Sequence, residues 1–288
     1  MPQRSVTVKG VAGLGNRIIT LAWAIRKSRK FNCQVEVDWS DGQIGPKGFD
    51  LFSAYFASQA VHRSIVSDWR IHSTSPDAKY NLLKSNKALR LLARIGRMDS
   101  DECWIKKYGV GNKYIFPLDL EMLMRRKAFC GAHLPSIECH QEIGEIFFNQ
   151  DTCEKFDSVL PRDIGERIGI HIRHSDKKAV KSFENVLEQY RDKKIFLATD
   201  SQLVKDYALS LNIDMTNMST MLHDGKENGG VHHRVLGHEE KIQAFEEGAL
   251  DMYALSKCRL FVGQSNSSFS RVVQIWRGSL APSFYWDK

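Results

Sequence analysis

The segment "IGIHIRHSDKK" (residues 168–178) concentrates basic and proton-transferring side chains directly after an apolar run. An arginine guanidinium presents a planar fork of donors that matches a diphosphate, and a nearby lysine adds a point charge. Arg173 and Lys177 are therefore predicted phosphate ligands. His174 is a candidate for proton transfer, whereas His171, inside the apolar run, is also compatible with a buried structural histidine.

A glycine-rich turn near the N-terminus is a second candidate anion site. Its pattern, Gly10-x-x-Gly13-x-Gly15, follows a predicted strand and opens a predicted helix. Backbone N–H groups at a helix N-terminus can approach a phosphate closely where no side chain intervenes. A tight turn that binds nothing is the alternative interpretation.

Asp38 raises the hypothesis of a nicotinamide-dependent dehydrogenase. It ends the next predicted strand about 25 residues after the glycines, where a dinucleotide-binding fold places an acidic residue. The glycine spacing is GxxGxG and not GxGxxG, which argues against that fold. Dependence of any activity on NAD and on Asp38 would distinguish this alternative.

The segment "GQSNSS" (residues 263–268) places small polar side chains between a predicted strand and a predicted helix. Gly263-x-Ser265 resembles a nucleophile elbow, but a hydrolase of that type needs a histidine after the serine, and the last histidine is His238. Ser267 and Ser268 fit better as hydrogen-bond donors to a phosphate at a helix N-terminus.

Several groups of potential metal ligands lack a regular spacing. Asp99 and Asp101 form a DxD pair, which in some glycosyltransferases ends a strand and holds a metal ion, but here the pair follows a helical pattern. The sequence therefore predicts no metal site. The same holds for the cysteines and histidines that cluster at Cys130, His133, Cys139, His140, His232, His233 and His238.

The elements that must position these residues alternate from about residue 166 onward. Apolar runs predict strands, and periodic patterns predict helices between them. This alternation implies a parallel sheet, whose ligands bind beyond the carboxyl ends of the strands. The predicted strands are 167–172, 194–199 and 259–263, and the predicted helices are Phe183–Arg191, Ser201–Leu211, Lys241–Ser256 and Ser267–Arg277.

The N-terminal part opens with a predicted strand, helix and strand over residues 5–39. The pattern is irregular up to about residue 150, with predicted helices at Asn86–Met98 and around 118–127. We therefore predict two domains, 1–160 as an α/β acceptor-side domain and 161–288 as a Rossmann-like nucleotide-sugar-binding domain.

Composition narrows the function classes. The chain has 288 residues, 42% of them hydrophobic, six cysteines and a net charge of +7, which favours an anionic partner. No recognisable nucleic-acid module, signal peptide or apolar run long enough to span a membrane is present in the sequence, so we expect a cytoplasmic protein with reduced cysteines.

The motifs "GLGNRI", "HIRHSDK", "FLATDS", "HHR" and "GALDMYALSKCRLFVGQSNSSFSR" follow one another in an order that resembles the α-1,6-fucosyltransferases, that is, the core and the rhizobial nodulation enzymes. The resemblance covers residues 166–277 well and the N-terminal unit loosely. It implies two Rossmann-like domains of a GT-B-like fold facing a central cleft. It also implies metal-independent, inverting transfer of fucose from GDP-fucose to a glycan.

The resemblance assigns roles position by position. His171 and Asp251 match the guanine ligands, and Arg173 matches the pyrophosphate ligand. The remaining positions matched to the donor site are Gly13, Gly15, Asn16, Arg17, Asp176, Lys177, Asp200, Ser267, Ser268 and Arg271.

Departures from the family pattern leave the catalytic base and the sugar open. The family has two successive arginines where this chain has Arg173 and His174, and its proposed glutamate base has Glu184 as its counterpart only across a gap. His174, Asp176 and Glu184 are thus the candidate bases. The alternatives are another donor, such as UDP-xylose, or a nucleotide-binding module without catalysis.

Overall fold

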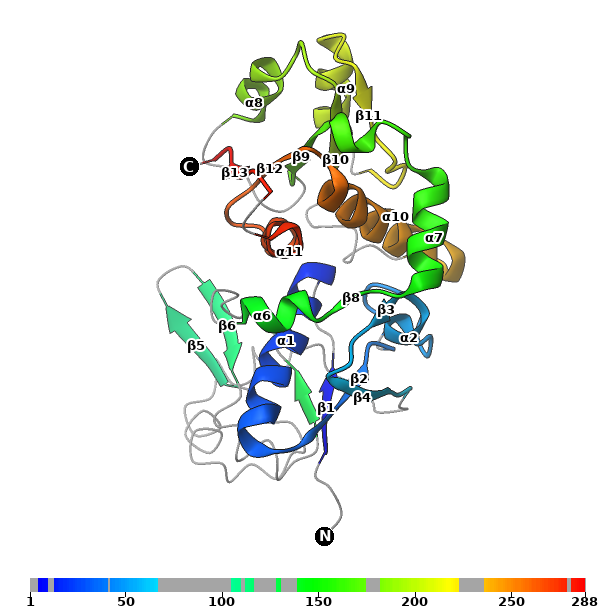
Figure 1. The fold of residues 1–288 in the computed structure, drawn as a ribbon, viewed down its shortest axis with the longest axis vertical. Helices are drawn as coiled ribbons and strands as arrows, with labels where there is room; N and C mark the ends of the chain where they lie inside the picture. The colour runs from blue at the N-terminus through cyan, green and yellow to red at the C-terminus, as the bar shows by residue number, and fades with distance from the viewer. Residues whose placement is uncertain are drawn as a thin grey trace. The chain divides into compact units, whose positions relative to one another are not determined.

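The computed structural model describes residues 5–9, 13–40, 42–66, 105–109, 112–116, 128–130, 139–174, 182–222, 236–278 and 281–287 (Figure 1). The chain divides into two compact units that meet in sequence between Asn149 and Gln150. Two short segments, Gly13–Gly15 and Gln43–Gly45, pack with the C-terminal unit although they precede this boundary.

The N-terminal unit contains a parallel sheet in the order β4-β2-β1-β7. Helix α1 connects β1 to β2 and buries Ile18, Leu21 and Ile25 at helical spacing, which confirms the predicted strand-helix-strand opening. The elements are β1 (Ser5–Lys9), α1 (Leu14–Phe31), β2 (Gln34–Asp38), α2 (Leu51–Tyr55), β3 (Phe56–Ala57), β4 (Val61–Ser64), β5 (Ile105–Gly109), β6 (Asn112–Phe116), β7 (Ala128–Cys130), α6 (His140–Gly144) and β8 (Phe147–Phe148).

The C-terminal unit contains a five-stranded sheet in the order β11-β10-β9-β12-β13, and every neighbouring pair is parallel. The strand order reverses between β9 and β12, where doubly wound sheets bind their ligands. The elements are α7 (Gln150–Val159), a 3-10 turn (Ile164–Glu166), β9 (Ile168–Ile172), α8 (Phe183–Gln189), β10 (Ile195–Thr199), α9 (Gln202–Ser210), β11 (Met215–Thr216), α10 (His238–Lys257), β12 (Leu260–Gly263), α11 (Ser268–Arg277) and β13 (Ser283–Tyr285).

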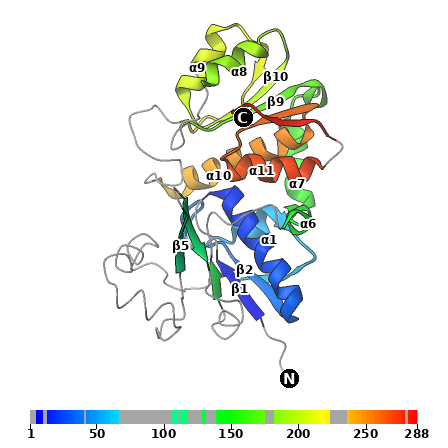
Figure 2. The same ribbon diagram turned by 90° about the vertical axis from the view of Figure 1, so that its left-hand side faces the viewer.

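Helices cover both faces of this C-terminal sheet (Figure 2). On one face Ile170 and Leu197 pack against α8 and α9 through Leu187 and Val204. On the other face Gly169 lies so close to α10 that an added Cβ would meet Leu255 Cδ2 at 2.8 Å. Strands buried on both faces are mostly apolar, which explains the nearly continuous apolar runs in β9 and β10.

The predicted alternation of strands and helices in the C-terminal unit is confirmed. Helix α10 begins at His238, earlier than predicted, because the Glu240 carboxylate accepts the N–H of Gly237 at 2.8 Å and caps the first turn. The sequence reading missed α7 and the short strands β11 and β13. The predicted helices at Asn86–Met98 and 118–127 lie outside the described residues.

Within the described part of the chain, no helix combines the length and apolar character needed to cross a bilayer.

Candidate functional site

A cavity of about 170 Å³ lies at the carboxyl ends of β9 and β10 and against α10. We call it the polar cavity. His171, Arg173 and Asp200 line it from the strand ends, and Asp251 lines it from α10. The structure therefore brings together four residues that the sequence singled out at three separate positions.

His171 is held in a fixed orientation by α11. Its ring stacks on Phe269 with a centroid distance of 4.7 Å, and Nδ1 lies 2.7 Å from the Ser270 hydroxyl oxygen. The backbone carbonyl of His171 accepts the Trp286 indole N–H at 3.2 Å. The side chain is 7% exposed, so it is a buried, oriented imidazole on the cavity wall.

Arg173 is placed by the neighbouring strand β12. Its backbone N–H donates to Gln264 Oε1 at 2.9 Å, and its guanidinium Nε lies 3.8 Å from the Asp200 carboxylate. Asp200 also accepts the backbone N–H of His174 at 2.9 Å. Because Gln264 and Asp200 come from the ends of β12 and β10, three strand ends together fix the position of Arg173.

The serine-rich turn forms the N-terminus of α11. Ser267 is the N-cap residue and is fully buried, and its hydroxyl accepts the backbone N–H of Ser270 at 3.5 Å. Ser268 is the first helical residue. The Arg271 guanidinium donates to the backbone carbonyl of Ser265 at 3.3 Å, which ties the turn together.

Asp251 has one engaged and one open oxygen. Oδ2 accepts a hydrogen bond from the Ser219 hydroxyl at 2.6 Å, whereas Oδ1 is buried and has no hydrogen-bond partner among the residues described. Burial raises the pKa of Asp251 to about 8, and the nearby Glu247 carboxylate contributes to the rise, while the Ser219 hydrogen bond opposes it. Asp251 lines the polar cavity, and a buried acceptor without a partner is a group that a ligand N–H would satisfy.

Glu247 holds residues 219–222 against α10, one helical turn before Asp251. Its Oε2 accepts the backbone N–H groups of Thr220 and Met221, each at 2.9 Å. Its Oε1 accepts the Gln243 amide at 3.0 Å and the Thr220 hydroxyl. We call this set of hydrogen bonds the Glu247 clasp; it keeps Ser219 within reach of Asp251.

The glycine turn begins α1. Gly15 has no room for a side chain, because an added Cβ would lie 2.5 Å from the backbone nitrogen of Phe269. Asn16 is half-buried, and Arg17 is fully buried within the N-terminal unit. Of these four predicted donor ligands, Gly13 and Gly15 pack with the unit that carries the polar cavity.

Two of the candidate bases, His174 and Glu184, do not line the polar cavity. The His174 ring packs edge-on against Phe183 at 5.2 Å, and the Glu184 carboxylate accepts a hydrogen bond from the Ser182 hydroxyl at the start of α8. Asp176 and Lys177 lie outside the described residues. The roles predicted for these four residues stay predictions.

Two residues behind the dehydrogenase and hydrolase hypotheses, Asp38 and Ser265, form local hydrogen bonds. Asp38 accepts the backbone N–H of Ser40 at 3.1 Å and the Ser40 hydroxyl at 2.5 Å, so it closes a turn. The Ser265 hydroxyl donates to Asp287 at 2.9 Å. Asp99, Asp101, His133, His232 and His233 lie outside the described residues, and in the described part no three of His, Cys, Asp and Glu gather as metal ligands.

Sequence reasoning missed four residues that shape the polar cavity. Ser219 and Met221 come from a loop with no periodic pattern, and Glu247 lies on a helix face whose polar residues look solvated. Of these, only Phe269 carried a usable signal, since it directly follows the serine-rich turn that was already a candidate site.

Comparisons with known proteins show the fold. No family model matches the chain, and no curated protein matches it in sequence. Among solved structures, the NodZ α-1,6-fucosyltransferase, from Bradyrhizobium, matches with a TM-score of 0.56 and 17% identity over 95% of this chain and 92% of its own, in a crystal soaked with GDP-fucose.

Two further solved structures agree. POFUT1 in complex with GDP has a TM-score of 0.54 and 11% identity, with 99% of each chain covered. Arabidopsis thaliana FUT1, as a mutant in complex with GDP, has a TM-score of 0.51 and 14% identity over 96% of this chain and 69% of its own. The chain therefore has the GT-B-type α/β fold of these fucosyltransferases, as the sequence predicted.

Proposed function

We propose that the chain is a metal-independent, inverting glycosyltransferase that transfers fucose from GDP-fucose to a glycan acceptor. The observation that carries the proposal is Asp251, which lines the polar cavity and has one buried carboxyl oxygen without a hydrogen-bond partner among the described residues. Guanine presents two adjacent donors, N1–H and the 2-amino group, to such an oxygen. Uracil presents only one N–H, between two carbonyl oxygens, so it offers the Asp251 carboxyl group one donor where guanine offers two.

Two groups support binding of the diphosphate, a guanidinium and a helix N-terminus. The Arg173 guanidinium lines the cavity, and the N-terminus of α11 begins at Ser268 beside His171. Helix N-termini and guanidinium groups both stabilise phosphate oxygens. In the proposed site Arg173, Ser267 and Ser268 hold the pyrophosphate, with Lys177 and Arg271 adding positive charge.

The proposed reaction forms one bond and breaks one. The acceptor hydroxyl oxygen attacks the anomeric carbon from the face opposite the diphosphate, the bond from that carbon to the phosphate oxygen breaks, and GDP leaves. The acceptor proton passes to a base, for which His174, Asp176 and Glu184 are the candidates. Arg173 and the start of α11 stabilise the charge that develops on the departing diphosphate.

Calorimetric titration with GDP, UDP and NAD, each with and without EDTA, tests the donor. We expect EDTA-insensitive binding of GDP alone. Preference for UDP would keep the fold but replace the donor, with UDP-xylose as the first candidate, and binding of NAD alone would overturn the reaction class.

The substitution Asp251→Asn tests the guanine contact without removing the side chain. Asparagine offers an N–H₂ group where the carboxylate offered an acceptor, so xanthosine diphosphate, whose C2 carbonyl replaces the 2-amino group, should now bind better than GDP. A variant that binds GDP as the unmodified chain does would contradict the proposal.

Transfer itself is tested with Arg173→Ala. We expect a loss of fucosyl transfer and of slow GDP-fucose hydrolysis of at least about 100-fold, because the leaving diphosphate loses its bidentate cation. Thermal unfolding at the wild-type temperature shows that the fold is intact. GDP-fucose binding by the wild-type chain with neither transfer nor hydrolysis would identify a binding module without catalysis.

A further inference from the structure

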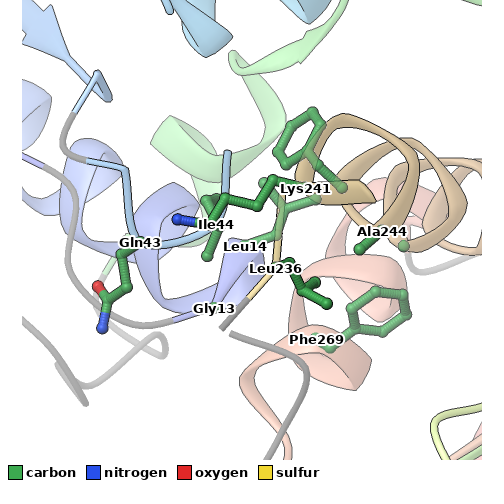
Figure 3. Close-up of a pocket in the computed structure, with 10 residues that line it drawn as sticks. Gly13, Leu14, Gln43, Ile44, Leu236, Lys241, Ala244 and Phe269 are labelled. Carbon is green, nitrogen blue, oxygen red and sulfur yellow. The ribbon is translucent and has the colours of Figure 1, made fainter. Parts of the chain in front are cut away.

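A second cavity of about 140 Å³ lies in the C-terminal unit (Figure 3). We call it the apolar cavity. Its large apolar side chains are Leu14, Ile44, Leu236, Phe245 and Phe269. A cavity of about 150 Å³ lined by such side chains holds one six-membered ring.

The apolar cavity continues the polar cavity. Ala244, Gly248 and Phe269 line both, so the two share one wall. Along α10 the wall runs from Asp251 in the polar cavity to Lys241 in the apolar cavity, a rise of about 15 Å. One nucleotide-sugar molecule, bound with its base at Asp251, would therefore extend toward the apolar cavity.

Two glycines of the wall could carry an alanine methyl group without a steric clash, so close packing does not explain why they are glycines. An added Cβ at Gly13 or Gly248 would meet no other atom within 4 Å, and neither residue has a positive φ. A glycine inside a helix such as α10 costs about 1 kcal/mol relative to alanine. Gly13 lines the apolar cavity alone and Gly248 lines both cavities, so the room that they leave adds to this shared space.

Polar and apolar groups separate within the wall. Figure 3 shows the polar ends of Gln43 and Lys241 on the side of Ile44, whereas Leu236, Ala244 and Phe269 form the other side. A sugar ring with hydroxyls along one edge and a methyl group on another matches this division. A sugar with hydroxyls all round would bury one against Leu236 and Phe269 without a partner.

We propose that the apolar cavity is the subsite for the transferred sugar, and that its apolar side selects a 6-deoxyhexose through the C6 methyl group. This inference rests on the proposed function, because the guanine of GDP-fucose must occupy the polar cavity for the sugar to reach the apolar cavity. It makes Leu236 and Phe269 residues that determine donor specificity.

The matched probe pair is GDP-L-fucose and GDP-L-galactose, which differ only by a hydroxyl at C6. We expect GDP-L-fucose to bind about 10- to 100-fold more tightly, the range that one added group produces in an apolar pocket. Leu236→Asn supplies a hydrogen-bond partner for the hydroxyl and should reduce this ratio about tenfold. The control is Leu203→Asn, at a position on α9 that is 58% exposed and lines neither cavity.

Binding of GDP itself distinguishes a failure of the sugar subsite from a failure of the proposed function. GDP carries no sugar, so all three proteins should bind it equally, which also shows that the variants fold. Equal affinity of the wild-type chain for the two nucleotide sugars, or an unchanged ratio in Leu236→Asn, overturns the sugar subsite alone. A wild-type chain that binds no GDP overturns the proposed function and the subsite with it.

Discussion

At the scale of one residue, the buried carboxyl group of Asp251 links the proposed donor site to the stability of the protein. Asp251 is buried with one oxygen unpartnered among the described residues, and its pKa is raised from 3.8 to about 8. The charged form is therefore disfavoured in the folded protein. The contribution of Asp251 to stability is complete below about pH 4 and is lost as the pH rises through about 8.

The neutral substitution Asp251→Asn should therefore stabilise the free protein increasingly as the pH rises. Each pH unit between 4 and 8 adds roughly 1.4 kcal/mol to the difference, as an upper bound. Melting temperatures of the variant and the wild-type chain at pH 5, 6, 7 and 8 measure it. Asp192→Asn, at a side chain that is 89% exposed, should show no such trend. A difference that does not change with pH would contradict the raised pKa.

At the scale of elements, the Glu247 clasp joins a loop without regular structure to a helix. In Glu247→Gln one carboxylate oxygen becomes an N–H₂ group, which then faces either the N–H groups of Thr220 and Met221 or the Gln243 amide. Two donors cannot satisfy each other, so Ser219 should be held less firmly beside Asp251. We expect GDP affinity to fall about tenfold in calorimetric titration.

The neighbouring residue provides a matched control for the clasp. Glu246 lies on the same helix, but its carboxylate pairs with Lys155 Nζ at 2.5 Å on α7. Glu246→Gln makes the same chemical change away from the polar cavity, and its GDP affinity should equal that of the wild-type chain. Equal GDP affinity of both variants would show that the Glu247 clasp does not position the guanine-binding wall of the polar cavity.

The elements also show what the sequence can reveal and where it stops. Strands β9, β10 and β12 were predictable because both of their faces are buried, which leaves continuous apolar runs. Strands β11 and β13 have two and three residues, too few for any period to emerge. In the site, His171 lies in a recognisable strand and Arg173 directly follows it. Ser219 reaches Asp251 only through a contact between residues 32 positions apart, which no local pattern records.

At the scale of the whole molecule, the two units should respond differently to a donor nucleotide. All residues that line either cavity belong to the C-terminal unit. They include Gly13 and Gln43 of the apolar cavity, which come from earlier in the chain. A ligand that is released by the opening motion slows hydrogen exchange by the factor 1 + [L]/Kd, about 100-fold at a concentration of 100 times Kd. Proteins with two units need not unfold in one step, so the slowing can be confined to one unit.

Hydrogen exchange with and without GDP therefore tests which unit binds. We expect slower exchange at amides near the polar cavity, such as those of Arg173, Met221 and Ser270, and unchanged exchange in β2 and β4. The glycine turn gives the sharpest test of the division between the units, because Gly13–Gly15 pack with the C-terminal unit although most of α1 does not. Slower exchange at Gly15 with no change at Ile25 would follow this division. Slower exchange only in β2, β4 and α1 would place the nucleotide in the N-terminal unit and contradict the assignment of the donor site.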